Sequence, residues 1–117
     1  MRSDSGSATV WWTALSALLW FVTLAVVATA TARLDRDRAT TAADLTALTA
    51  AADAVHGTER ACAKARATAE ANRASLTSCV LTGPFAEVVV SVPSSLIDRR
   101  VMARARAGPA AVSHEEV

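Results

Sequence analysis

The sequence predicts an α+β fold: a long N-terminal transmembrane helix continuing into an alanine-rich amphipathic helix, a second helix, and a small antiparallel sheet of two or three strands. No charged residue lies between Asp4 and Arg33. Alanine, a good helix former, dominates the next segments, and a valine-rich run follows a Gly-Pro turn near the end. We therefore expect a polar leader (1–7), a transmembrane helix (8–32), its amphipathic continuation (33–56), a small head (57–109) and a disordered tail (110–117).

The apolar segment is long enough to cross a bilayer. Residues 10–32 exceed the ~20 residues that a membrane-crossing helix needs. Trp11 and Trp12 are placed as membrane-interface anchors. The buried helix of a soluble protein would normally show one polar face, and this segment shows none. The sequence therefore favours a helix retained in the membrane, with lipid as a partner.

A cleaved secretory signal is the alternative. The stretches 28–30 and 30–32 both read Ala-Thr-Ala, the small-x-small pattern that signal peptidase accepts. Release after Ala30 or Ala32 would give a small secreted binding protein. The apolar run is longer than the usual signal core of about 7–15 residues, which favours retention.

The helix is expected to continue beyond the membrane. Arg33 with Asp37, and Asp35 with Arg38, are spaced to pair on a helix surface. Further along, an apolar seam recurs at spacings of three and four, and we expect it to bury against the head or a neighbouring subunit. The seam consists of Leu45, Leu48, Ala52 and Val55.

The head should begin with a second helix at Thr58, a suitable N-cap, with Glu59 in the first turn. Leu76–Thr82 and Ala86–Val92 read as strands around the Gly83-Pro84 turn. Residues 101–107 alternate small and basic side chains, which fits an edge strand with arginines facing water or, alternatively, a helix.

Cys62 and Cys79 are the only cysteines. A disulfide between them would stabilise the head by ~3 kcal/mol in the chain-entropy picture. Two unrelated buried thiols are the alternative. Because disulfides persist in oxidising compartments, pairing would place the head outside the cytoplasm.

The arginines around the membrane helix suggest the opposite orientation. Arg33, Arg36 and Arg38 follow the helix, whereas only Arg2 and the amino terminus precede it. The margin is one charge, and two aspartates lie among the three arginines. We therefore follow the cysteines and expect a single-pass protein of the cell membrane with a cytoplasmic N-terminus and an extracytoplasmic head.

The sequence offers no chemistry for catalysis. It has no nucleophile–base motif, phosphate-binding loop or paired carboxylates, and two histidines are too few for a metal site. The net charge of +1 gives no reason to expect nucleic acid. We expect neither an enzyme nor a cofactor, and no small-molecule substrate.

The order of these parts resembles the TadE-like pilus-assembly proteins, in particular the short actinobacterial type associated with tight-adherence (Flp) secretion. The resemblance lies in a leader ending in glycine, an uninterrupted apolar helix, an ADL-type alanine-rich continuation and a small head with two cysteines. The stretches that carry it are Ser5–Val10, Thr41–Leu48, Ala61–Ala63 with Cys79, and Ala103–Pro109.

The resemblance implies a pilin-like fold and a minor pilin-like subunit of a type IV-related pilus or secretion system. Its partners would be other pilin-like subunits or the assembly platform. It also implies cleavage after Gly6, which leaves Ser7 as the new terminus. Pilins of this class usually carry glutamate five residues after the cut, where this sequence has Trp11.

Overall fold

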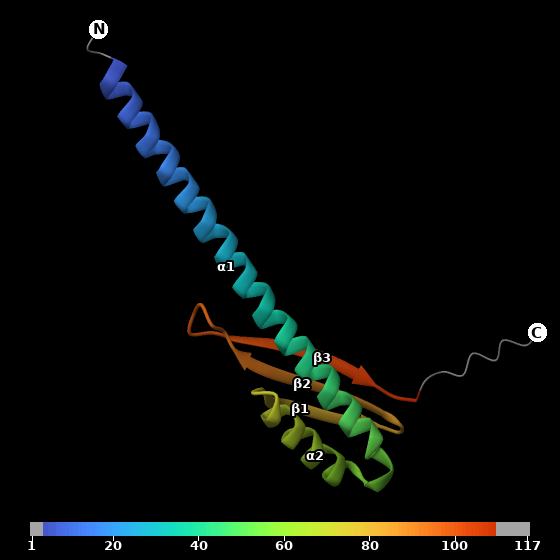
Figure 1. Ribbon diagram of the computed structural model, residues 1–117. Coiled ribbons are helices and arrows are strands. Elements are labelled where there is room, and N and C mark those ends of the chain that lie inside the picture. Colours follow the sequence, from blue (N-terminus) through green and yellow to red (C-terminus); the bar gives the residue numbers. More distant parts are fainter. Residues whose placement is uncertain (1–3, 110–117) are drawn as a thin grey trace, which may run out of the picture.

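A computed structural model describes residues 4–109 of the chain. Within them the chain forms a long helix followed by a small α+β head (Figure 1). The elements are α1 (Asp4–Ala52), the short 3-10 helix η1 (Ala54–His56), α2 (Thr58–Ala71), β1 (Ser75–Thr82), β2 (Phe85–Pro93) and β3 (Arg100–Ala107). The fold class predicted from the sequence is confirmed. The expected tail, 110–117, and the first three residues of the leader lie outside the described residues.

Helix α1 is uninterrupted over 49 residues, or about 74 Å at the usual rise of 1.5 Å per residue. No glycine or proline lies between Gly6 and Gly57, so no kink-forming residue interrupts it. Its first half projects away from the head, and its second half lies across the sheet (Figure 1). One rigid element therefore joins the apolar segment to the head.

The sheet is antiparallel, with strand order β1-β2-β3. Val88 in the central strand pairs with Cys79 on β1 and with Ala105 on β3. The connection between β1 and β2 passes through Gly83, whose φ of 59° lies in the left-handed region that glycine tolerates best. The uncertain third segment is a strand rather than a helix.

Both helices cover one face of the sheet, and the other face is open. On the open face Arg104 lies 3.6 Å from Glu87, and Arg106 sits 4.8 Å above the centre of the Phe85 ring. Both arginines are exposed, as predicted for this strand. The head therefore has two layers, with a single core between helices and sheet.

The core is built from small residues. Its α1 contribution is almost entirely alanine, and α2 adds alanines at i, i+4 and i+8. Valines of β2 supply the largest apolar side chains that are fully buried. Small side chains let the helix axes approach each other and the sheet closely. The buried set from the helices is Ala39, Ala42, Ala43, Thr46, Ala47 and Ala50 with Ala61, Ala65 and Ala69; the set from β2 is Ala86, Val88, Val90, Ser91 and Val92.

The predicted seam on α1 does not pack against the head. Leu45, Leu48 and Val55 are 42%, 59% and 87% exposed, and Ala52 is exposed as well. The alanines occupy the inward face instead, because a leucine face would hold the helix too far from the sheet. The expectation that the seam buries against the head is wrong. Its alternative, burial against a neighbouring subunit, stays a prediction.

Two local expectations also need correction. Helix α2 begins at Thr58, but Gly57 holds the cap position, and no side chain caps the helix. The charged residues of α1 that follow its apolar segment do not pair as expected. Among the described residues, neither Arg33 with Asp37 nor Asp35 with Arg38 forms an ion pair. Asp35 has a different set of partners, described below.

Candidate assembly and membrane surfaces

The first half of α1 is apolar around its whole circumference and makes no contact with the head. Every described side chain from Gly6 to Ala30 is exposed, including Trp11, Trp20 and Phe21. Among the described residues, α1 is the one helix long and apolar enough to cross a membrane. In water so large an apolar surface would be strongly disfavoured, so it requires a membrane or a protein partner.

Five hydroxyl groups of this segment are satisfied within the helix. The hydroxyls of Ser16, Thr23 and Thr31 donate to the carbonyl oxygens four residues earlier, at 2.9, 2.8 and 2.7 Å. Thr13 and Thr29 do the same. An unsatisfied polar group in hydrocarbon costs several kcal/mol. These internal bonds therefore make the surface compatible with lipid.

Asp35 joins the apolar helix to the head. Although it lies on α1, it is only 4% exposed. It accepts hydrogen bonds from the backbone amide of Ser95 at 2.9 Å and from the Ser95 hydroxyl at 2.8 Å, with the Ser94 hydroxyl at 3.4 Å. The pKa of Asp35 is lowered, chiefly by the backbone hydrogen bond from Ser95. The carboxylate thus fixes the β2–β3 loop beside α1.

The disulfide between Cys62 and Cys79 links α2 to β1, with an S–S distance of 2.05 Å. A β-bulge between Leu76 and Ser78 makes this link possible. Side chains alternate between the two faces of a strand, and one extra residue reverses that alternation. The bulge therefore puts Leu76, Cys79 and Leu81 on the face covered by the helices, where all three pack against the core.

A second buried carboxylate, Asp53, closes the opposite end of α1. It is 2.8 Å from the Lys64 ammonium group on α2 and 3.2 Å from Nδ1 of His56. The Lys64 contact is an ion pair that does not have hydrogen-bond geometry. Lys64 is also the main cause of the lowered pKa of Asp53. The three residues fix the turn between the helices.

The exposed seam continues into a shallow groove at the far end of the head. Leu48, Ala52 and Val55 line one side of this groove, which has a volume of about 380 Å³. Pro84, Gly108 and Pro109 line its other side. An exposed leucine pair beside an apolar groove is a surface suited to contact another protein.

The residues of the expected leader site lie in the first turns of α1. Gly6 and Ser7 are both helical and exposed, and no described side chain lies within 4 Å of the position that a Cβ atom would take at Gly6. Trp11 is exposed one turn further on.

Together, the fold and these surfaces define an α+β protein whose small head is carried by one long helix that is apolar enough to cross a membrane. Residues 6–53 match a protein family described as putative Flp pilus-assembly TadE/G-like. The match covers nearly all of α1 and ends at Asp53, so the TadE-like resemblance seen in the sequence is confirmed over that segment. Neither the curated proteins nor the solved structures contain a match to the chain.

Proposed function

We propose that this protein is a structural, minor pilin-like subunit of a Tad/Flp-type pilus or secretion assembly, and not an enzyme. One observation carries the proposal: the segment that matches the pilus-assembly family is the helix whose apolar surface the head leaves uncovered. In the proposal, residues 8–32 cross the cell membrane and residues 33–109 stand outside it. The partners are membrane lipid and other pilin-like subunits or the assembly platform.

The proposed orientation, with the N-terminus in the cytoplasm, is supported by the disulfide. Both cysteines of the chain are consumed in the Cys62–Cys79 bridge. Such a bridge persists in an oxidising compartment and is rare where thioredoxin and glutathione keep thiols reduced. Retention of the helix, rather than release after Ala30 or Ala32, is supported by the family match, which runs across both sites without interruption.

The proposed contact with a neighbouring subunit is the seam of α1. Leu45 and Leu48 are large, apolar and exposed, whereas the face toward the head uses alanine. Burying a leucine side chain contributes about 1.5–3 kcal/mol relative to leaving it in water. A second pilin-like helix packed on this face would bury both leucines at once.

The double substitution Leu45→Asp with Leu48→Asp tests this contact. Both positions are exposed in the single chain. We therefore expect the variant to form its disulfide and to have a free energy of unfolding within about 0.5 kcal/mol of that of the parent. Its association with partners should be lost, because two unpaired charges would enter an apolar contact. The readouts are thermal unfolding of the purified protein and co-purification from native membranes.

The matched control is Thr40→Asp with Ala67→Asp. It adds the same charge at exposed positions away from the seam and should keep its partners. Equal co-purification of the seam variant and the parent would contradict the proposed contact. A seam variant that fails to fold would show instead that the leucines support the head itself.

A further inference from the structure

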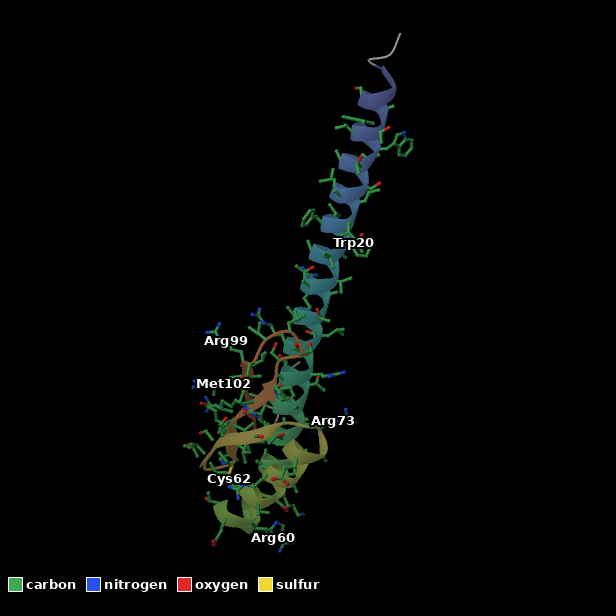
Figure 2. The ribbon with its side chains drawn as sticks, turned by 90° about the vertical axis from the view of Figure 1, so that its left-hand side faces the viewer. Trp20, Arg60, Cys62, Arg73, Arg99 and Met102 are labelled. Carbon is green, nitrogen blue, oxygen red and sulfur yellow. A yellow bond between two sulfur atoms is a disulfide. The ribbon has the colours of Figure 1, made fainter. Side chains whose placement is uncertain are left out.

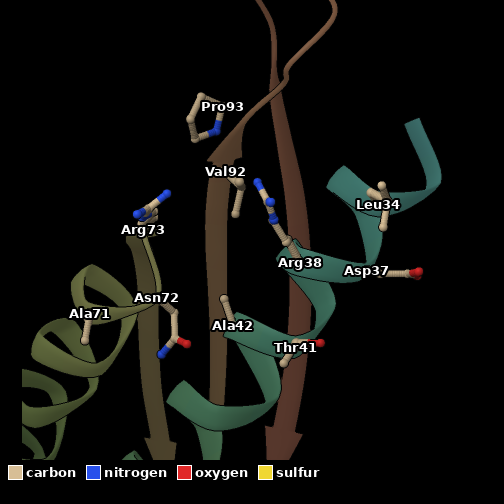
Figure 3. Close-up of a pocket in the computed structure, with 10 residues that line it drawn as sticks. All are labelled: Leu34, Asp37, Arg38, Thr41, Ala42, Ala71, Asn72, Arg73, Val92 and Pro93. Carbon is tan, nitrogen blue, oxygen red and sulfur yellow. The ribbon is translucent and has the colours of Figure 1, made fainter. Parts of the chain in front are cut away.

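Two grooves open beside α1 at the end of the head nearest the projecting apolar helix. The first, of about 650 Å³, lies between α1, the C-terminal end of α2 and the end of β2. Figure 3 shows Arg38 and Arg73 on the two sides of Val92 in this groove. The second, of about 440 Å³, lies between α1 and the β2–β3 loop. We call the two grooves and the loop (residues 94–99) the basal surface.

The charges lining the two grooves are mostly positive. They comprise five arginines and two aspartates, a net charge of +3. The exposed Asp98 of the loop brings the net charge of the whole basal surface to +2. One of the aspartates, Asp35, is already occupied by Ser94 and Ser95. None of the five arginines forms an ion pair with a described residue, and only the guanidinium group of Arg100 is engaged, since it donates to the hydroxyl oxygens of Ser91 and Ser75. The five are Arg36, Arg38, Arg73, Arg99 and Arg100.

The loop adds an exposed apolar pair to this positive surface. Leu96 and Ile97 are 50% and 58% exposed, although they are among the few large apolar residues of the head. The loop is held in place, since Asp35 accepts from Ser95 and the Ser94 amide donates to the Arg99 carbonyl at 2.8 Å. The apolar pair is therefore presented in a fixed position.

The basal surface lies at the level where the apolar helix ends. Ala32, the last residue before the first arginine of α1, lines the second groove together with Leu96, Ile97 and Arg99. Figure 2 shows Arg99 at the end of the head nearer Trp20 and Arg60 at the opposite end. If α1 crosses a bilayer up to residue 32, this surface meets the lipid headgroups.

We propose that the basal surface is a docking surface for anionic phospholipid headgroups. The arginine guanidinium groups contact lipid phosphates, because they are planar, permanently charged donors suited to phosphate oxygens. Leu96 and Ile97 enter the interfacial region between them, as the apolar residues of membrane-surface segments do. The inference rests on the proposed function only in requiring that α1 crosses a membrane.

The same contact gives a physical reason for the arginines that follow the apolar segment of α1. They would favour a cytoplasmic head if they acted only as an orientation signal. Basic residues near an anionic membrane surface are attracted to it over about a Debye length. In the proposed arrangement they bind headgroups of the leaflet on the side of the head.

Depth-dependent quenching of a probe on the β2–β3 loop tests the docking surface. Because the disulfide uses both native cysteines, Ile97→Cys creates a single labelling site in the full-length protein. The labelled protein is placed in nanodiscs of phosphatidylcholine, with or without phosphatidylglycerol, that contain lipid spin-labelled at the headgroup. Val55→Cys provides the control site, because the rise of α1 alone puts it about 30 Å beyond the end of the apolar segment.

We expect severalfold stronger quenching at position 97 than at position 55, increasing with phosphatidylglycerol and decreasing at high salt. Arg36→Gln with Arg99→Gln should reduce quenching at position 97. Arg60→Gln with Arg66→Gln removes the same charge elsewhere on the head and should leave it unchanged. Equal quenching at positions 97 and 55 would overturn the inference. So would quenching at position 97 that changes neither with lipid charge nor with the Arg36 and Arg99 substitutions. An acidic protein would then become the candidate occupant.

A parallel measurement separates this inference from the proposed function. In a Trp11→Phe, Trp12→Phe background, Trp20 is the only tryptophan, and lipid with a quencher in mid-chain reports whether α1 lies in the bilayer. Quenching of Trp20 without quenching at position 97 would contradict the docking surface alone. Absence of both would contradict the membrane-crossing helix as well.

Discussion

Asp35 on α1 accepts two hydrogen bonds from Ser95, a residue 60 positions further along the chain, from its amide at 2.9 Å and its hydroxyl at 2.8 Å. This contact closes the fold at the end nearest the apolar helix, where no disulfide is present. It places a buried carboxylate just beyond the apolar segment, with Arg33 before it and Arg36 after it along α1. The contact therefore ties the position of the β2–β3 loop to a titratable group.

We expect this contact to make the head less stable in acid. The pKa of Asp35 is lowered from its ordinary value of 3.8, so the folded state favours the carboxylate. The stabilisation is present above pH 3.8 and is lost as the pH falls through the lowered pKa. Thermal unfolding between pH 7 and pH 2 should show that Asp35→Asn is less stable than the parent at neutral pH, and that the difference shrinks in acid.

Asp53 provides the comparison, because its pKa is also lowered, chiefly by Lys64. Asp53→Asn should remove a part of the pH dependence of the stability of the head that is separate from the part due to Asp35. A constant difference between the parent and Asp35→Asn at every pH would show that the carboxylate charge plays no part in holding the loop.

A leucine should destabilise the head at a buried alanine position of α1, although the adjacent exposed position already holds a leucine. Ala47 is buried against the sheet, and Leu48 beside it is 59% exposed. Ala47→Leu should destabilise the head by about 1–3 kcal/mol through overpacking. Leu48→Ala should change stability by less than about 0.5 kcal/mol, as for an ordinary surface position. Chemical denaturation of both variants measures the contrast, and equal effects would contradict the burial pattern.

The disulfide should supply a large part of the stability of the head. Its 17-residue sequence separation corresponds to ~3 kcal/mol in the chain-entropy picture. In the double variant Cys62→Ser with Cys79→Ser, the head should therefore become sensitive to protease, while the protein should still insert into membranes. Thiol labelling of the native protein without reductant should find no free cysteine. Quantitative labelling of both thiols would remove the reason for placing the head outside the cytoplasm.

The mature N-terminus and the side of the membrane that holds the head test the proposed topology. Mass measurement and N-terminal sequencing should give Met1 or Ser7 if the helix is retained. They would give Thr31 or Arg33 if signal peptidase releases the head. A reporter fused after Val117 should be active only outside the cytoplasm, and cytoplasmic activity would reverse the orientation.

The elements were predictable from the sequence because each has a strong local signal. The charge-free apolar run, the alanine-rich helices and the valine strand all appear where their residues indicate. The inward face of α1 was not predictable in the same way. Larger apolar residues normally mark the buried face, but here the close approach of helix and sheet selects alanine and leaves Leu45 and Leu48 outside.

The long-range contacts of the site were the hardest to foresee. Asp35 lies in a run of alternating charges that suggests surface pairing, and nothing local identifies Ser95 as its partner. The disulfide was anticipated from composition, but the inward orientation of Cys79 depends on the bulge near Ser78. A strand without that bulge would point the same cysteine away from α2.

The unbroken course of α1 also sets an angular relation between its two halves. Successive residues of an α-helix are about 100° apart around its axis, from 3.6 residues per turn. No glycine or proline lies between Gly6 and Gly57, so the direction in which the apolar side chains of α1 point around the helix axis determines the direction in which the head points. One alanine inserted between Arg38 and Ala39 would turn one half by about 100° relative to the other and lengthen the rod by about 1.5 Å. Since the sheet packs on a defined face of α1, the number of residues between the two halves sets the direction in which the head faces around the helix axis. In the proposed assembly, that direction would decide which side of the head meets a neighbouring subunit.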